Sequence, residues 1–372
     1  MIPFNKPYSG GTETRYIRQA LRTGKISGNG LFTQQCQTYF EQRYQFGKCL
    51  LTTSCTDALE MAAMLLDIKP GDEVIMPSFT FVSTALAFVR QGATIVFADS
   101  RADHPGMDET RLQQLITPQT KAIVVVHYAG VACDMDKIMR LAHEHHLFVV
   151  EDAALAINAF YNGKALGSIG HLACFSFHDT KNIHCGEGGM LVINDARYQK
   201  RAEILWEKGT NRAEFYRGET NKYNWVDTGS SFLPSEINAA FLWAQIHRLD
   251  KIQHKRNKIW RTYYDALMPW AQKLNLQLPQ VPTYAAHNAH LFYLVCNSPQ
   301  QRTHLIQHLK DNGILSVFHY QSLHRSPYYQ PHYSGPELLQ ANRYSDCLLR
   351  LPMFYTLGSR HIKHIVKVGK SF

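Results

Sequence analysis

The sequence predicts an α/β protein with a mostly parallel, mixed sheet between helices, followed by a smaller α+β domain. In the first two thirds of the chain, short apolar runs rich in β-branched residues alternate with helical patterns; the runs cover 74–76, 94–97, 122–126 and 148–150. Such runs are typical of strands that are buried on both faces of a sheet. A chain of 372 residues is expected to form about two domains, which we place at 1–245 and 246–372.

The helices between these strands follow from the pattern of apolar side chains. Residues 57–66 are apolar on nearly every side, which predicts a buried helix that Pro70-Gly71 ends. Asp134 can cap a second helix that runs to about His146. Toward the C-terminus we expect helices at 237–249, 251–267 and 300–312, and strands at 290–296 and 315–318.

The composition excludes several classes of protein. Hydrophobic residues make up 45% and charged residues 19% of the chain, which is typical of a globular protein. No stretch approaches the roughly 20 apolar residues of a membrane span, and the first residues hold no apolar signal-peptide core, so we expect a cytoplasmic location. The net charge of +9 would suit nucleic acid or anionic small molecules, and no nucleic-acid motif accompanies it.

Metal binding and disulfide bonds are not expected. The eight cysteines are scattered and form no C-x-x-C pair, which argues against both a zinc finger and a disulfide scaffold. The sequence HEHH at 143–146 lacks the spacing of an HExxH zinc site. We therefore expect these histidines at the protein surface.

The most informative segment joins an apolar strand to a glycine-rich turn. Residues 173–182 end in a polar cluster that contains Lys181, and the glycines of 186–189 lead into a strand at 190–193. Glycines permit positive φ and a close approach of the backbone to a ligand. A Lys withdrawn from water has a lowered pKa, which suits Schiff-base formation. Taken alone, the segment favours a β-hairpin with a solvated Lys181 at its tip.

Two further segments could bind other parts of a ligand. Asp152 ends an apolar strand, where open α/β sheets bind ligands, and it could meet a cationic group or cap a helix. Cys55 and Thr56 begin a buried helix, whose N-terminus could bind phosphate or be an ordinary capped end. The chain has no GxGxxG or GxxxxGK[ST] motif. A phosphate site, an acid and an amine together are what pyridoxal 5′-phosphate requires of a protein.

These segments resemble motifs of the DegT/DnrJ/EryC1/StrS sugar aminotransferases, which are fold type I enzymes that depend on pyridoxal 5′-phosphate. The similar motifs include SFHDTKN…GEGGM (176–190), EDAA (151–154), SCTDALEMA (54–62), FNKP (4–7) and FHYQSLH (318–324). The resemblance implies transfer of an amino group from L-glutamate to a nucleotide-linked keto-sugar. The expected acceptor is dTDP-4-keto-6-deoxyglucose and the expected product dTDP-4-amino-4,6-dideoxygalactose, for lipopolysaccharide or enterobacterial common antigen biosynthesis.

The resemblance also implies roles for individual residues. Lys181 would form the Schiff base with the cofactor and shuttle protons, while Asp152 would keep the ring nitrogen protonated. Further cofactor contacts are implied at Cys55, Thr56 and Ser176 for the phosphate, at Phe81 and Leu155 for the ring, and at Ser231 across a subunit interface. Substrate contacts are implied at Lys6, His319, Tyr320 and His324.

Two positions depart from the usual pattern of the family. Leu155 stands where relatives usually carry His or Gln, and a Leu can stack on the ring but cannot hydrogen-bond. Ser231 stands where Asn is common. The segment 227–236 matches one that reaches into the partner subunit's site, so we expect a homodimer with shared active sites.

Three alternatives stay open for the function. The chain could be another nucleotide-sugar 3- or 4-aminotransferase, or a sugar dehydratase that uses the same cofactor. Some dehydratases carry His in place of the Lys, so Lys181 favours transamination. In a different class, the chain could be a catalytically silent regulatory homologue, which Leu155 alone hints at.

Overall fold

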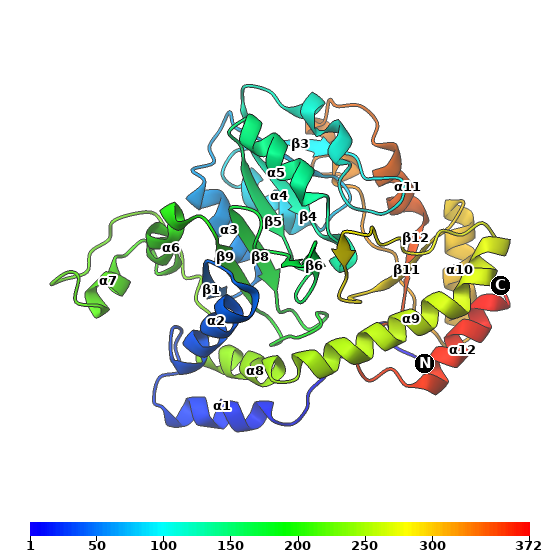
Figure 1. Ribbon diagram of the computed structural model, residues 1–372, viewed down its shortest axis with the longest axis horizontal. Coiled ribbons are helices and arrows are strands. Elements are labelled where there is room, and N and C mark those ends of the chain that lie inside the picture. Colours follow the sequence, from blue (N-terminus) through cyan, green and yellow to red (C-terminus); the bar gives the residue numbers. More distant parts are fainter.

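A seven-stranded mixed sheet with helices on both faces forms the centre of the computed structural model, which describes residues 1–372 (Figure 1). The strand order is β1-β9-β8-β5-β4-β2-β3. The five strands from β8 to β3 are parallel to one another, whereas β9 is antiparallel to both β8 and β1. The strands are β1 (Lys48–Thr52), β2 (Glu73–Pro77), β3 (Thr94–Ala98), β4 (Thr120–Val126), β5 (Phe148–Asp152), β8 (Leu172–Ser176) and β9 (Gly189–Ile193). The predicted fold class is confirmed.

Burial on both faces of the sheet explains the continuous apolar runs. In β4, Val124 belongs to one hydrophobic core, whereas Ile123 and Val125 belong to a second core on the opposite face. Helices α3 (Cys55–Leu65) and α4 (Val82–Val89) pack into the first core, and α2 (Leu31–Tyr44), α5 (Met135–Glu144) and α8 (Glu236–Ile246) pack into the second. Each strand therefore presents apolar side chains in both directions.

The predicted helix starts are close to the observed ones. The helix expected at 57–66 begins at Cys55, where the Ser54 hydroxyl accepts the N–H of Asp57 at 3.1 Å. Asp134 caps α5 as predicted, because its carboxylate accepts the N–H of Lys137 at 3.3 Å. The HEHH sequence at the end of α5 is exposed. None of the helices is both long and apolar enough to cross a membrane.

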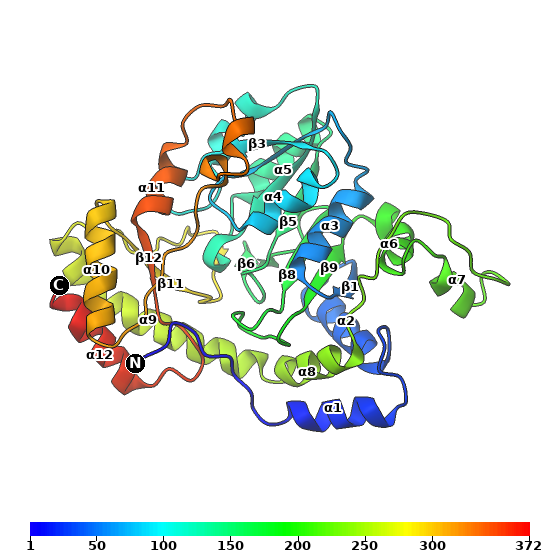
Figure 2. The same ribbon diagram turned by 180° about the vertical axis from the view of Figure 1, so that it is seen from behind.

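The C-terminal part of the chain forms a smaller α+β assembly. The long helix α9 (Leu249–Lys273) runs from beneath the sheet toward both chain termini (Figures 1 and 2). Strands β11 (Phe292–Val295) and β12 (Leu348–Leu351) pair antiparallel, next to α10 (Pro299–Asp311), α11 (Leu339–Cys347) and α12 (Ser359–Lys370). The domain boundary that we place near residue 245 falls at the end of α8, and it stays a prediction.

The strand predicted at 315–318 is wrong. This segment pairs only through isolated bridges, one between Ile314 and Ile2 and one between Val317 and Arg350. Because the two bridges lie on different neighbours, the segment forms no continuous ladder. Its extended course nevertheless ties the N-terminus to the C-terminal assembly.

The remaining helices and strands lie outside the seven-stranded sheet. Helix α7 lies in an arm that projects from the body of the molecule (Figures 1 and 2). These elements are α1 (Glu13–Arg22), α6 (Gln199–Trp206), α7 (Arg212–Tyr216), β6 (Phe160–Tyr161), β7 (Lys164–Ala165) and β10 (Ala285–Ala286).

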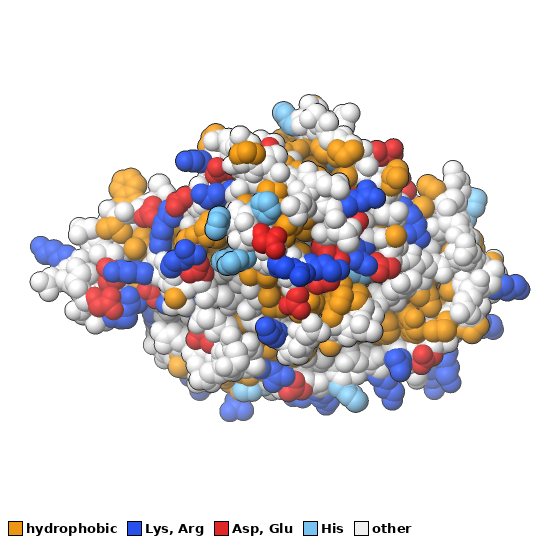
Figure 3. Space-filling view, turned by 45° about the horizontal axis from the view of Figure 1, so that its top comes forward, with side chains coloured by type: hydrophobic (Ala, Val, Ile, Leu, Met, Phe, Trp, Pro, Cys, Tyr) orange, Lys and Arg blue, Asp and Glu red, His pale blue; other side chains and the backbone are white.

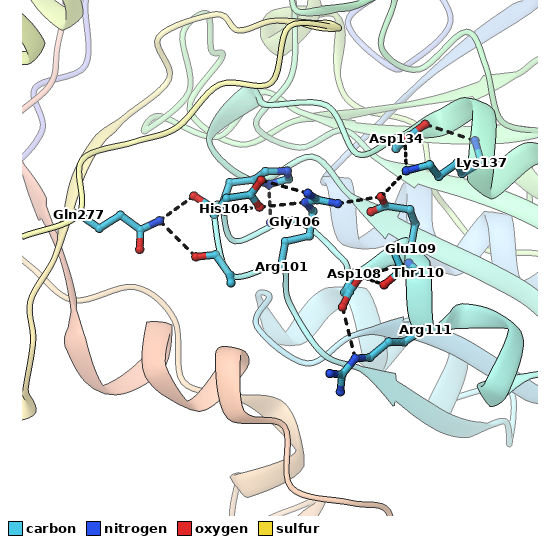
Figure 4. Close-up of polar contacts among 12 residues, drawn as sticks. Arg101, His104, Gly106, Asp108, Glu109, Thr110, Arg111, Asp134, Lys137 and Gln277 are labelled. Atoms are coloured by element: carbon cyan, nitrogen blue, oxygen red, sulfur yellow. Dashed lines mark hydrogen bonds and ion pairs between the residues drawn. The ribbon is translucent and has the colours of Figure 1, made fainter.

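An ionic network fixes the loop that follows β3 (Figure 4). Arg101 binds the buried carboxylate of Glu109 at 2.7 Å, and Lys137 of α5 binds the same carboxylate at 3.2 Å. From the C-terminal part, the Gln277 amide donates to the Asp103 carbonyl at 2.6 Å. The network thus joins the sheet, α5 and the C-terminal assembly.

Candidate active site

The carboxyl ends of β4, β5 and β8 open into a cavity of about 750 Å³. This is the edge at which open α/β sheets bind ligands, and the volume is typical of a small-molecule site. Nine of the residues predicted from the sequence line the cavity: Cys55, Thr56, Phe81, Asp152, Leu155, Ser176, Lys181, His319 and Tyr320. The fold therefore brings together segments that are far apart in the chain.

Lys181 lies in the connection between β8 and β9 and is half-buried in the cavity wall. The next residue, Asn182, donates its side-chain N–H to the Asn288 carbonyl at 2.9 Å, which holds the connection against the body of the protein. The predicted hairpin is confirmed, because β8 and β9 pair antiparallel, whereas the prediction of a solvated Lys181 is wrong, because this side chain lies in the cavity wall. Burial lowers the pKa of Lys181 to about 8, and the positive charge of Arg350 acts in the same direction.

Asp152 is a buried acid at the end of β5. Its carboxylate accepts hydrogen bonds from the Thr84 hydroxyl at 2.7 Å and from the Ala154 N–H at 3.1 Å. No helix follows at once, so the alternative of a helix cap is wrong. Burial raises the pKa of Asp152, which these two hydrogen bonds and the charge of Lys181 partly offset. Such a carboxylate can still accept a hydrogen bond from the N–H of a protonated ring nitrogen.

The N-terminus of α3 forms a second wall of the cavity. Ser54 caps the N–H of Asp57, whereas the N–H groups of Cys55 and Thr56 have no acceptor within the helix. The Thr56 and Ser83 hydroxyls lie 2.8 Å apart, and Ser176 lines the cavity nearby. Free N–H groups and hydroxyls at a helix N-terminus are suited to a phosphate.

Only some of the residues predicted to contact substrate line the cavity. His319 lines the cavity, with its Nδ1 3.2 Å from the Tyr128 hydroxyl, and Tyr320 packs its ring against Phe81. His324 does not line the cavity, because its Nδ1 is buried against the Ser78 hydroxyl at 2.6 Å.

Two other predicted residues also lie outside the cavity of this chain. Lys6 and Ser231 are both exposed, and neither is part of the cavity wall. Ser231 forms an isolated backbone bridge with Glu207.

Several cavity residues were not singled out from the sequence. Thr84 binds Asp152, and His290, Arg350, Phe4 and Asn5 line the cavity. Arg350 could have been found from the sequence, since it is the one charged residue in the apolar strand LLRL. A charge that interrupts a buried strand indicates a specific partner or ligand.

The geometry of the cavity favours chemistry that uses the Lys181 amine as a nucleophile or base. A Lys with a pKa near 8, opposite a buried acid and a phosphate-type helix N-terminus, suits Schiff-base chemistry on a phosphorylated cofactor. On this mixed sheet the arrangement defines a fold type I aminotransferase. The chain belongs to the DegT/DnrJ/EryC1/StrS aminotransferase family, whose model matches residues 7–368.

Individual relatives agree with this assignment over nearly the whole chain. The spore coat polysaccharide biosynthesis protein SpsC of Bacillus subtilis is 33% identical, with 98% of this chain and 95% of the relative covered. The putative sugar aminotransferase Spr1654 from Streptococcus pneumoniae, in its PMP-form, has a TM-score of 0.91 at 26% identity, with 100% and 98% of the chains covered. DesV from S. venezuelae has a TM-score of 0.90 at 29% identity, with the same coverage.

The predicted cofactor, pyridoxal 5′-phosphate, is confirmed by the family and by the solved PLP-form and PMP-form of Spr1654. The residues of this chain fit the cofactor. The free N–H groups of Cys55 and Thr56 suit its phosphate, Asp152 its ring nitrogen and Lys181 its aldehyde.

Gly189, the first residue of β9, lies directly beneath the N-terminus of α3. A Cβ at this position would lie 2.3 Å from the Ser54 carbonyl oxygen and 2.5 Å from the Cys55 nitrogen. Because backbone atoms cannot yield to such a contact, any side chain would displace the first turn of α3 and the N–H groups that face the cavity.

We expect Gly189→Ala to weaken cofactor binding by about tenfold or more, which corresponds to roughly 1.4 kcal/mol. Titration of the cofactor-free protein with pyridoxal 5′-phosphate, followed by absorbance, measures this effect. Gly358→Ala is the matched control, since a Cβ there meets no atom within 4 Å. Equal affinities for the two variants would contradict the assigned role of Gly189.

Proposed function

We propose that this protein transfers an amino group from L-glutamate to a nucleotide-linked keto-sugar, with dTDP-4-keto-6-deoxyglucose as the acceptor. The observation that carries the proposal is the common cavity of Lys181, Asp152 and the N-terminus of α3. Membership of a sugar aminotransferase family supports the substrate class. The name of SpsC, a polysaccharide biosynthesis protein, supports a role in making a surface polysaccharide.

The bound cofactor supplies an electron sink for the electrons released at the reacting carbon. Lys181 supplies the base: with a pKa of about 8, its Nζ can accept a proton at neutral pH and return it during the same turnover. Asp152 holds a proton on the ring nitrogen, and Thr84 orients the Asp152 carboxylate for that contact. Phe81 and Leu155 line the cavity from opposite segments, and both offer apolar surface to the ring.

The mouth of the cavity supports a substrate larger than glutamate. Phe81 and Val82 of α4 and its cap are 54% and 51% exposed, and Phe318 from the C-terminal part is 50% exposed. Large apolar side chains left in water around a cavity mark a surface that a ligand or partner covers. A planar base carried by the substrate would fit such a rim.

The same reasoning supports a homodimer with shared active sites. The arm that carries α7 exposes Tyr216, Trp225 and Val226, whose exposed fractions are 67%, 80% and 51%. Exposed aromatic side chains on a projecting segment suit contact with a second chain. In this proposal Ser231, which lies outside the cavity of its own chain, contacts the cofactor phosphate of the partner subunit.

On the face of the molecule that Figure 3 shows, the surface charge gives no support to a nucleic-acid function. In Figure 3, Lys and Arg side chains across the middle of the displayed face lie next to Asp and Glu. The net charge of +9 instead agrees with a cofactor, a donor and an acceptor that are all anionic.

The apolar side chain of Leu155 is the observation that favours an alternative function. Leu155 is 5% exposed and lines the cavity, so at the position where the resemblance implies His or Gln this chain offers an apolar side chain that cannot hydrogen-bond. The alternatives are a different nucleotide-sugar 3- or 4-aminotransferase, a sugar dehydratase and a silent regulatory homologue.

A two-step experiment tests the proposal. L-Glutamate added to the cofactor-loaded protein is expected to convert the cofactor spectrum to that of pyridoxamine phosphate, and dTDP-4-keto-6-deoxyglucose is expected to reverse the change. Mass spectrometry and NMR of the product then show nitrogen at C4. No conversion by glutamate would indicate a silent homologue. Nitrogen at C3 would indicate a 3-aminotransferase, and loss of oxygen without nitrogen a dehydratase.

A further inference from the structure

Arg350 of β12 is a cation in the cavity wall without an anionic partner. Its Nε is buried and has no hydrogen-bond partner, and one terminal N–H reaches the Phe318 carbonyl at 3.4 Å. No carboxylate of the chain forms an ion pair with it. The guanidinium lies over the ring of Phe4, 4.5 Å from its centroid, and this stacking contact uses none of its N–H groups.

A second buried arginine shows what a purely structural guanidinium does in this fold. Arg256 of α9 donates to the carbonyls of Ala289 at 3.1 Å and Met353 at 3.3 Å, and also to the carbonyl of His290. Its donors are therefore used by the protein. A buried charge without such partners is costly, so the unused donors of Arg350 indicate an anion that comes from outside the chain.

The histidines near Arg350 do not compete for that anion. The Asn182 amide donates to the Asn288 carbonyl, so its oxygen accepts from His290 Nδ1 at 3.0 Å. This contact fixes the proton on Nδ1 of a neutral ring. Burial lowers the pKa of both His290 and His319 well below the usual value. Lys181 and Arg350 are then the only Lys and Arg residues in the cavity wall.

The position of Arg350 indicates which anion it binds: the cofactor phosphate, the carboxylate of the amino donor or the diphosphate of the nucleotide sugar. The N-terminus of α3 is suited to the cofactor phosphate, and Arg350 comes instead from the C-terminal assembly, with His319 and Asn5. Arg350 and Lys181 both line this cavity, so the two side chains border the same space. In an amino-acid donor the carboxylate is bonded directly to the reacting carbon, whereas in a nucleotide sugar the pyranose ring separates the diphosphate from the ketone.

We propose that Arg350 binds the carboxylate next to the reacting carbon of the amino donor, through the paired N–H groups of its guanidinium. The inference rests on the proposed function, because it assigns the donor's subsite within that reaction. A planar guanidinium matches a carboxylate in two parallel hydrogen bonds, which a Lys in its place cannot reproduce. Phe4 keeps the guanidinium plane in position, which gives the N-terminal segment a role in donor binding.

The test compares two partners of the pyridoxamine-phosphate form in Arg350→Gln, Arg350→Lys and wild type. 2-Oxoglutarate carries the carboxylate and the keto-sugar does not. For Arg350→Gln, the second-order rate constant with 2-oxoglutarate is expected to fall by about 10- to 150-fold, and that with dTDP-4-keto-6-deoxyglucose to change by less than about threefold. Arg350→Lys should lie between. Arg325→Gln is the control, because Arg325 is exposed and pairs with Asp346.

Thermal unfolding of the cofactor-free protein separates binding from a structural role. Because Arg350 has no anionic partner in the protein, Arg350→Met is expected not to lower the melting temperature. Equal loss of rate with both partners, or a lowered melting temperature, would overturn the proposal. Loss with the keto-sugar alone would also overturn it and assign Arg350 to the diphosphate.

Failure of the proposed function would give a different result in the same experiment from failure of the proposed role of Arg350. A wild-type protein that reacts with 2-oxoglutarate but not with the keto-sugar would refute the proposed acceptor. The rate with L-glutamate in Arg350→Gln would then decide the role of Arg350, since only a carboxylate contact predicts a slower reaction at an unchanged melting temperature.

Discussion

Lys181→Ala is expected to lower the turnover of glutamate and keto-sugar by at least about 10⁴-fold and to remove the absorbance band of the covalently held cofactor. In the proposed function the variant loses two functions at once, because the same Nζ is assigned both the contact with the cofactor aldehyde and the transfer of the proton. The amine is suited to both, since burial lowers its pKa to about 8 and leaves part of it unprotonated at neutral pH. Absorbance of the purified variant and a coupled assay for 2-oxoglutarate measure the two effects.

The control for this variant is Lys164→Ala, which removes an exposed Lys on β7. Far-UV circular dichroism of both variants should match that of the wild type, because the hydrogen bond that Lys181 donates to the His178 carbonyl comes from its backbone N–H, which Ala keeps. Full turnover by Lys181→Ala would refute the assignment of an aminotransferase site to this cavity.

The central sheet could be predicted from the sequence because its signal is local. Val74, Ile95, Val124 and Val150 lie in continuous apolar runs, and such runs follow directly from burial on both faces. The strand expected at 315–318 failed for the opposite reason. Whether this segment joins a ladder depends on where Ile2 meets Ile314 and where Arg350 meets Val317, and no local sequence pattern encodes these contacts.

The candidate site could be predicted in part. Asp152 and Cys55 lie at strand ends, and the carboxyl ends of parallel strands meet at one edge of a sheet. The environment of Lys181 could not be predicted, because Asn182 is anchored by Asn288, more than a hundred positions away. His324 shows the same limit: its side chain is bound to Ser78 instead of facing the cavity.

Asp152→Asn is expected to reduce turnover by about 10²–10³-fold while the cofactor stays bound through Lys181 and the N-terminus of α3. An amide has nearly the same shape as the carboxylate but cannot hold a proton on the ring nitrogen. The cofactor then loses most of its capacity to accept electrons. Rapid mixing with L-glutamate measures the rate of conversion to the pyridoxamine form. Asp311→Asn, an exposed position on α10, is the control.

The stability of the cofactor-free protein distinguishes this loss from misfolding. Burial raises the pKa of Asp152 above its value of about 3.9 in an unfolded chain, so the folded state holds the proton more tightly. Its contribution to stability is therefore present at low pH and is lost as the pH rises through the folded pKa. At neutral pH the ionised acid destabilises the cofactor-free fold, and Asp152→Asn should leave the melting temperature unchanged or higher. A lower melting temperature would assign Asp152 to the fold instead, whereas inactivity in a stable protein would mean that the acid is kept buried for the cofactor.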